Sequence, residues 1–162
     1  MGARAQGSPG EGVALIRQGL SDMLALGSRA GVSEFLSVLA EAQALDGQTD
    51  EALATSENAL QANPEEIISR PHILTCRGEL RIKLGQTEQA EADFLEAIAL
   101  AQKMSAKSFE LRAATSLARL LMKQGKRDEA RAMLLENYNW FTEGFDTADQ
   151  KDAKELLDES PA

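Results

Sequence analysis

The sequence has one cysteine, one histidine and one tryptophan, and aromatic residues make up 4% of its 162 residues. The single cysteine, Cys76, excludes an internal disulfide and is typical of a reducing compartment. The sequence has no run of eighteen apolar residues, and its N-terminus has no apolar core like that of a signal peptide. We therefore expect a cytoplasmic protein that does not associate with a membrane.

Residues suited to catalysis or to cofactor binding are also scarce. The lone histidine leaves no second histidine for a catalytic pair, and the sequence has no glycine-rich phosphate loop. His72 and Cys76 are four residues apart, but two such ligands without a further His or Cys make a poor zinc site. Glu65 and Glu66 fall in a connector, where solvation is the expected role rather than acid–base chemistry. We expect no enzyme activity, no cofactor and no metal in this chain.

The charge is strongly acidic and unevenly distributed. The net charge of -9 argues against general affinity for nucleic acid or for anionic membranes. Residues 33–66 contain eight acidic residues and no Lys or Arg, whereas residues 106–133 carry seven basic residues against three acidic ones. Residues 134–162 return to eight acidic residues against two basic ones. Solvated helix faces account for this distribution in the simplest interpretation.

The periodicity of apolar residues predicts helices throughout, and no alternating strand pattern is convincing. We expect a disordered leader or expression remnant over residues 1–10, a helical domain over 11–158 and a disordered tail over 159–162. The predicted helices span residues 11–26, 32–45, 49–63, 71–84, 87–102, 106–124, 128–139 and 148–157. Thr49, Thr87 and Thr147 are expected to cap the helices that follow them. Gly78 lies inside a helix, which indicates that another helix passes close to it.

The helices form an internal repeat. The turn glycines Gly47, Gly85 and Gly125 are separated by 38 and 40 residues. Ala14, Ala52, Ala90 and Ala130 start the inner face of four second helices at spacings of 38, 38 and 40. Such a period indicates a solenoid of helix pairs, in which each pair buries its apolar face against its neighbours.

These repeats resemble the tetratricopeptide repeat (TPR) family, whose pattern has small and large residues at fixed helix positions. The matching residues are Leu36, Leu39, Ala40, Ala52, Ala59 and Pro64 in the first copy, Gly78, Ala90, Phe94 and Ala97 in the second, and Leu117, Ala118, Ala130 and Leu134 in the third. The chain departs from the pattern at the aromatic positions, which hold Gln43, Arg81 and Leu121, and its period exceeds 34 residues. The resemblance implies an all-α, right-handed TPR-like superhelix of about three hairpins with a leading and a capping helix.

A narrower resemblance covers the C-terminal half. The strings FELRAATSLARLL, QGKRDEARAML and YNWFTEGFDTADQKDAKELLDE look like the end of bacterial multidomain regulators. Those proteins join a class III adenylate or guanylate cyclase, or a DNA-binding regulator, to a P-loop ATPase and a terminal repeat array. The resemblance implies a protein–protein interaction, scaffolding or regulatory module of a signalling or transcription-regulatory protein. The alternatives are the non-catalytic C-terminal tail of a cyclase or ATPase, and a self-association module.

In this family the first helix of each pair lines a concave groove. The groove-lining residues expected here are Glu34, Ser37, Glu41, His72, Thr75, Glu79, Lys83, Arg112, Thr115, Arg119 and Lys123. One end of that groove is acidic and the other basic, which suits a protein or peptide partner, or another domain of the same protein, with the opposite polarity. Ordinary surface charge is the alternative.

Two further features bear on binding. Tyr138, Trp140, Phe141 and Phe145 form an aromatic cluster, which we interpret as a core that fastens the last helix, with a binding hot spot as the alternative. If the cluster is a buried core, Trp140→Ala lowers the free energy of unfolding by about 3 to 5 kcal/mol. The repeat pattern begins with a second helix at residues 11–26, as in a segment of a longer array. The open face of that helix would then contact a missing neighbour or a second copy in a homodimer.

Overall fold

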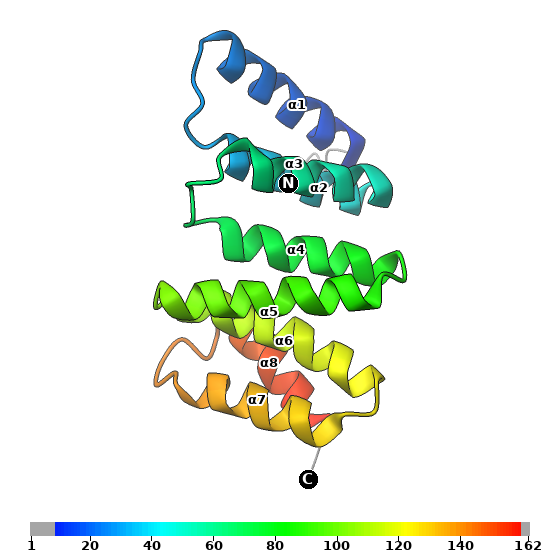
Figure 1. The fold of residues 1–162 in the computed structure, drawn as a ribbon, viewed down its shortest axis with the longest axis vertical. Coiled ribbons are helices and arrows are strands. Elements are labelled where there is room, and N and C mark those ends of the chain that lie inside the picture. The colour runs from blue at the N-terminus through cyan, green and yellow to red at the C-terminus, as the bar shows by residue number, and fades with distance from the viewer. Residues whose placement is uncertain (1–8, 160–162) are drawn as a thin grey trace, which may run out of the picture. The chain divides into compact units, whose positions relative to one another are not determined.

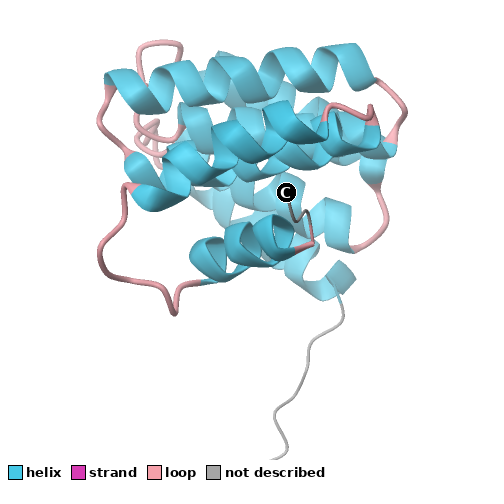
Figure 2. Ribbon diagram, turned by 90° about the horizontal axis from the view of Figure 1, so that it is seen from below, coloured by secondary structure: helices cyan, strands magenta, loops and turns pink. Residues whose placement is uncertain are grey.

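The computed structural model describes residues 9–159, and its regular secondary structure there is entirely helical (Figure 1, Figure 2). The helices are α1 (Pro9–Ala25), α2 (Val32–Leu45), α3 (Thr49–Ala62), α4 (Arg70–Lys83), α5 (Thr87–Lys103), α6 (Lys107–Lys123), α7 (Arg127–Asn139) and α8 (Ala148–Asp158). These bounds confirm the predicted helices to within two residues. Within residues 9–159 no helix has the length and apolar character that a membrane crossing requires.

The expected leader and tail lie mostly outside the described residues. Residues 1–8 and 160–162 are not described, so the expectation of disorder there stays a prediction. Pro9 and Gly10, which we had placed in the leader, begin α1. Glu159 is the C-cap of α8 rather than part of a separate tail.

The chain divides into two compact units, residues 1–69 and residues 70–162. In the first unit α2 and α3 form a hairpin, and α1 packs against α2. In the second unit α4 and α5 form a hairpin, α6 packs on both helices, and α7 folds back against α6. Helix α8 packs on α6 and α7. The paired helices place α4, α6 and α8 as successive neighbours, which is the arrangement that the groove requires.

The helix pairs are joined by one recurring turn. Gly47, Gly85 and Gly125 have φ values of 81°, 75° and 83°, which confirms that each closes a helix in the left-handed conformation. The amide of the next residue then bonds back into the preceding helix, as from Gln86 N–H to the Arg81 carbonyl at 2.8 Å. Ser105 adopts the same conformation with a φ of 55°, and joins α5 to α6 without a glycine.

The expected N-cap position is wrong for Thr49 and Thr87 and is confirmed for Thr147. Thr49 and Thr87 are the first helical residues, and Gln48 and Gln86 occupy the N-cap positions without a side-chain cap bond. Thr147 is the N-cap of α8, but its side chain makes no cap hydrogen bond either. The glycine turn fixes the entry of α3 and α5, so the chain reaches the N-cap of these two helices already aligned without a side-chain cap.

Small residues at the predicted repeat positions allow the helices to pack closely. Ala52, Ala90 and Ala130 are fully buried, as the repeat predicts. The expectation for Ala14 was wrong, because Ala14 is exposed. Val13 is the buried residue of α1, with 4% of its surface exposed. Helix α1 is therefore rotated by one residue relative to the alignment with the later second helices.

Polar residues at two aromatic positions of the repeat have acidic partners. Gln43 is buried, and its Nε2 donates to Glu51 Oε2 of α3 at 3.4 Å. Arg81 donates to Asp93 of α5 at 2.9 Å, and Arg77 donates to the same carboxylate at 3.0 and 2.5 Å. Asp93 is only 2% exposed, so two guanidinium groups compensate its buried charge. The α4–α5 hairpin thus contains an ion cluster where the family pattern has an aromatic side chain.

Gly78 confirms the expected close approach of a second helix. A Cβ atom built on Gly78 would lie 2.5 Å from Cε1 of Phe94, a ring that is 1% exposed. Helices α4 and α5 therefore approach closely because residue 78 has no side chain.

We predict that Gly78→Ala lowers the free energy of unfolding by about 1–3 kcal/mol, because the methyl group must displace the Phe94 ring. Urea denaturation measures the change. Gly19→Ala is the matched control, since its helix position is open, and it should be neutral or stabilising by up to about 1 kcal/mol. Equal stability of Gly78→Ala and the wild type would contradict the packing argument.

Candidate peptide-binding groove

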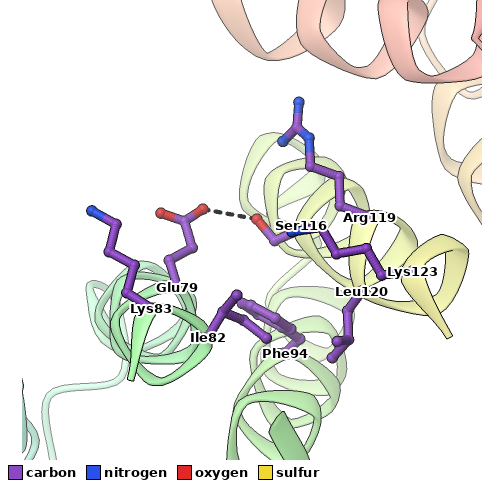
Figure 3. Close-up of a pocket in the computed structure, with 8 residues that line it drawn as sticks. All are labelled: Glu79, Ile82, Lys83, Phe94, Ser116, Arg119, Leu120 and Lys123. Carbon is purple, nitrogen blue, oxygen red and sulfur yellow. Dashed lines mark hydrogen bonds between the residues drawn. The ribbon is translucent and has the colours of Figure 1, made fainter. Parts of the chain in front are cut away.

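A cavity of about 350 Å³ lies between α4 and α6 (Figure 3). Its volume falls within the range of about 300–1,000 Å³ that is usual for ligand pockets. The lining residues are Glu79, Ile82 and Lys83 from α4, Phe94 from α5, and Ser116, Arg119, Leu120 and Lys123 from α6. All of them belong to the second unit, so the packing of α4, α5 and α6 alone builds the cavity.

The cavity has an apolar floor and a mainly cationic rim. Ile82, Phe94 and Leu120 supply the apolar floor. The rim carries three cationic side chains, which Figure 3 draws as part of the lining. They are Lys83 of α4 and Arg119 and Lys123 of α6. Glu79 is the one carboxylate of the lining, and it accepts a hydrogen bond from Ser116 Oγ at 2.8 Å. This combination suits a ligand with an apolar side chain next to negative charge.

A second cavity of about 400 Å³ continues from the first toward α8. It is lined by Arg119, Met122, Lys123, Arg127, Leu156 and Glu159. Arg119 and Lys123 line both cavities, and Arg119 is paired with Asp152 of α8. The two cavities are therefore neighbours that share these side chains, and we name them together the α4–α6–α8 groove.

The structure brings four of the predicted groove residues together. Glu79, Lys83, Arg119 and Lys123 line the α4–α6–α8 groove. Thr75 and Thr115 are buried, and each donates its hydroxyl to a carbonyl one turn earlier, at Pro71 and Leu111, at 2.8 Å. These two side chains are therefore engaged inside their own helices and do not face the groove.

The other predicted groove residues are not in the lining of the two cavities. Ser37 is buried, while Glu34 and Glu41 are exposed on α2 in the first unit. The acidic end expected for the groove thus stays a prediction. Arg112 is half-buried and pairs with Asp149 of α8, with contacts at 3.0 and 2.9 Å.

His72 and Cys76 lie on one face of α4, as their spacing predicts. The Cys76 Sγ atom lies 3.8 Å from the His72 ring nitrogens, and the ring stacks on Phe109 at a centroid distance of 6.2 Å. Arg112 Nη1 lies 3.2 Å from Nδ1 of His72. A guanidinium beside the imidazole opposes a metal cation there, because the two positive charges would repel each other.

Sequence reasoning missed the apolar floor and the α8 side of the groove. Ile82 and Leu120 were omitted because we selected only polar positions on the first helices. Phe94 comes from a second helix, but the missing side chain at Gly78 was a usable signal that its ring reaches α4. Leu156 of α8 also lines the second cavity, and sequence analysis assigned it no role in the groove.

The interpretation of the aromatic cluster as a buried core is confirmed for Tyr138 and Phe141, which are half-buried and pack against the core, and is wrong for the other two residues. Trp140 is 58% exposed and Phe145 is 47% exposed. The α8 helix is instead fastened by Ala153, Leu156 and Leu157, which belong to the buried core shared with α5, α6 and α7. Trp140 at the end of α7 and Phe145 in the connection to α8 are the two aromatic residues of the cluster that solvent reaches.

The helix hairpins and their concave groove define the class of α-helical repeat proteins. Matches to the tetratricopeptide repeat pattern cover residues 33–58, 73–104 and 111–136, together just over half of the chain. The chain therefore belongs to the tetratricopeptide repeat family. The three segments correspond to the α2–α3, α4–α5 and α6–α7 hairpins. Such repeats imply protein–protein interaction and are typically non-catalytic.

Solved structures with the same fold include a putative kinesin light chain of Podosopora anserina with nearly identical TPR-like repeats. It is 19% identical, with a TM-score of 0.71, and the match covers 94% of this chain and 77% of that one. A variant of that protein is 20% identical, with a TM-score of 0.73, and its match covers 94% of this chain and 76% of the variant. BtubC (BKLC) from P. vanneervenii is 15% identical, with a TM-score of 0.71, and the match covers 91% of this chain and 63% of BtubC. The search of curated proteins found no match.

We predict that Trp140→Ala changes the free energy of unfolding by less than about 1 kcal/mol, because the side chain is mostly exposed. Leu134→Ala is the contrasting variant, since Leu134 is fully buried, and it should cost about 2–5 kcal/mol. Urea unfolding followed by circular dichroism compares both without relying on tryptophan emission. A loss for Trp140→Ala as large as that for Leu134→Ala would restore the buried-core interpretation.

Proposed function

We propose that this chain is a peptide-binding module, and that the α4–α6–α8 groove holds an acidic segment of a partner protein or of another domain. The observation that carries this proposal is the cation rim around an apolar floor in a cavity of about 350 Å³. An apolar side chain on the floor supplies burial, worth about 25 cal/mol for each Å² removed from water. Flanking carboxylates then meet Lys83 and Lys123, which sets register and on-rate.

An extended ligand is favoured because the two cavities share part of their lining. Arg119 and Lys123 lie between the α4 side and the α8 side, so one peptide contacts both cavities as it passes them. Leu120 supplies apolar surface on the α4 side, and Leu156 does so on the α8 side. The preferred ligand therefore carries two apolar side chains with acidic residues between them.

We predict that the chain selects acidic peptides from a library of eight-residue peptides in which leucine or phenylalanine alternates with random acidic, neutral or basic positions. The double variant Lys83→Glu with Lys123→Glu should raise the Kd of the selected peptides at least about tenfold, because like charges then face each other. Fluorescence anisotropy with labelled peptides measures the change.

The matched control is Lys103→Glu, an exposed lysine at the end of α5 and outside the groove lining. It changes the net charge in the same direction as the groove variant and should leave the Kd within about twofold. Selection of basic peptides, or equal losses in both variants, would contradict a specific groove.

We further propose that the module works in the cytoplasm within a larger bacterial signalling or transcription-regulatory protein. The support is the resemblance of segments within residues 109–159 to the terminal repeat arrays of such proteins. The alternative within this context is the non-catalytic tail of an adenylate or guanylate cyclase or of an ATPase. The native gene upstream of residue 1 tests the context: a P-loop ATPase reading frame joined to this sequence supports it, and an unrelated frame contradicts it.

Self-association through α1 is a second candidate function, and exposed leucines favour it. Leu15 is 74% exposed, Leu24 is 49% exposed, and Leu26 just after α1 is 87% exposed. These side chains leave apolar surface in water on a helix that packs through Val13 and neighbouring residues against α2.

We predict a concentration-dependent dimer by multi-angle light scattering that Leu15→Glu with Leu24→Glu converts to a monomer. Removal of residues 1–26 should have the same effect. Leu95→Glu, an exposed leucine on α5, is the control and should leave the mass unchanged. A monomer for the wild type at every concentration would exclude this candidate.

A further inference from the structure

The aromatic residues Tyr138, Trp140, Phe141 and Phe145 form a surface that the groove does not use, which we name the aromatic edge. Trp140 contacts Phe141 edge-on at a centroid distance of 5.1 Å, and Tyr138 contacts Phe145 at 5.9 Å. Trp140 and Phe145 nevertheless remain 58% and 47% exposed. Large aromatic side chains left in water in this way are typical of interaction surfaces.

The backbone holds the aromatic edge in a defined shape. Trp140 is the C-cap of α7, and the Phe141 amide donates to the Tyr138 carbonyl at 3.2 Å. Gly144 has a φ of 77°, and its carbonyl accepts from the Thr147 amide at 3.0 Å. A ligand therefore meets ordered rings, and binding does not require the loop to become ordered first.

Exposed carboxylates lie close in sequence to the aromatic edge. Residues 136–149 contain four acidic residues and no Lys or Arg. Glu136 precedes Trp140 by four residues and shares its side of α7, while Glu143 and Asp146 flank Phe145; all three carboxylates are exposed. The fourth acidic residue, Asp149, forms an ion pair with Arg112. The segment that carries the aromatic edge is thus acidic, and the one cation beside its rings, Lys107 of α6, is itself paired with Glu110.

The Trp140 ring already attracts a cation within the chain. The Lys107 ammonium lies 5.6 Å from the ring centroid, although it is also paired with Glu110 at 2.7 Å. Ammonium and guanidinium groups are attracted to the face of an indole ring, and nearby carboxylates add to that attraction. More than half of the Trp140 surface is still exposed, which leaves room for a second cation.

We propose that the aromatic edge binds a cationic segment of a partner protein, with an arginine or lysine side chain stacked on Trp140. Glu136, Glu143 and Asp146 supply the complementary charge, and Phe141 and Phe145 contact the apolar stem of the bound side chain. This ligand is opposite in charge to the one proposed for the α4–α6–α8 groove, so the two sites are independent.

The test uses Trp140 as its own reporter, because it is the only tryptophan in the chain. The full chain is titrated with the peptide Gly-Leu-Arg-Gly-Arg-Leu-Gly, and with the same peptide carrying neutral citrulline in place of arginine. We expect a saturable change in emission with the arginine peptide, a Kd at least about fivefold higher with the citrulline peptide, and weaker binding as salt is added.

Variants locate the binding by calorimetry. Trp140→Leu should raise the Kd of the arginine peptide at least about fivefold. The double variant Glu143→Gln with Asp146→Asn should also raise the Kd of the arginine peptide and should reduce the salt dependence of that Kd. The control Glu88→Gln with Glu129→Gln removes the same charge from exposed positions in the first turns of α5 and α7, and should have little effect.

Several outcomes would overturn the proposal. Equal affinity for the citrulline peptide excludes cation recognition, and an unchanged Kd in Trp140→Leu places the peptide elsewhere. A shift in Trp140 emission with chain concentration alone identifies a second copy as the occupant, and that also contradicts it. Lys83→Glu with Lys123→Glu should leave binding of the arginine peptide intact, so failure of the groove proposal and failure of this one are distinguishable.

Discussion

The second unit depends on the close contact between α4 and α5 at Gly78. The Phe94 ring fills the space that a side chain on residue 78 would take, and it is almost completely buried there. The same ring forms part of the floor of the α4–α6–α8 groove. One contact therefore sets both the separation of the hairpin helices and the depth of the cavity, because a ring displaced from Gly78 would enter the space meant for a ligand.

The ion cluster beside this contact compensates for a missing aromatic side chain. Where the repeat pattern places an aromatic residue, Arg81 meets Asp93, and Arg77 binds the same carboxylate. A buried ion pair contributes little net stability, because both charges lose water. Its directional bonds nevertheless fix how α4 is rotated and shifted relative to α5. The departure from the family pattern thus replaces nonspecific apolar packing with a contact that has one geometry.

The sequence predicted the helices well because each one ends at a local signal. Gly47, Gly85 and Gly125 each close a helix, and residues without that signal still follow the same path, as Ser105 does. Side-chain caps could not be predicted reliably, because the turn itself orients the next helix. Ala14 shows a second limit, since a spacing does not decide which of two adjacent residues faces the core when the helix packs on one neighbour.

The candidate site was predictable only in its charges. The resemblance to the repeat family assigned Glu79, Lys83, Arg119 and Lys123 to the groove side of the first helices, and these four residues line the cavity between α4 and α6. Burial of Thr75 and Thr115 depends on how neighbouring helices cover them, which periodicity does not report. Trp140 was misassigned for a related reason: aromatic residues are usually buried, but whether a particular ring is covered depends on the path of the chain after α7.

Opposite local charges on one unit matter more for recognition than the acidic total. Screening limits the reach of surface charges to about 8–10 Å at physiological ionic strength, so a ligand at the groove responds to Lys83 and Lys123 rather than to the net charge. A ligand at the aromatic edge responds to Glu143 and Asp146 for the same reason. Each surface therefore rejects the ligand of the other through like-charge repulsion. A small repeat unit with two such surfaces can hold two unlike segments together, which is the physical requirement for a scaffold.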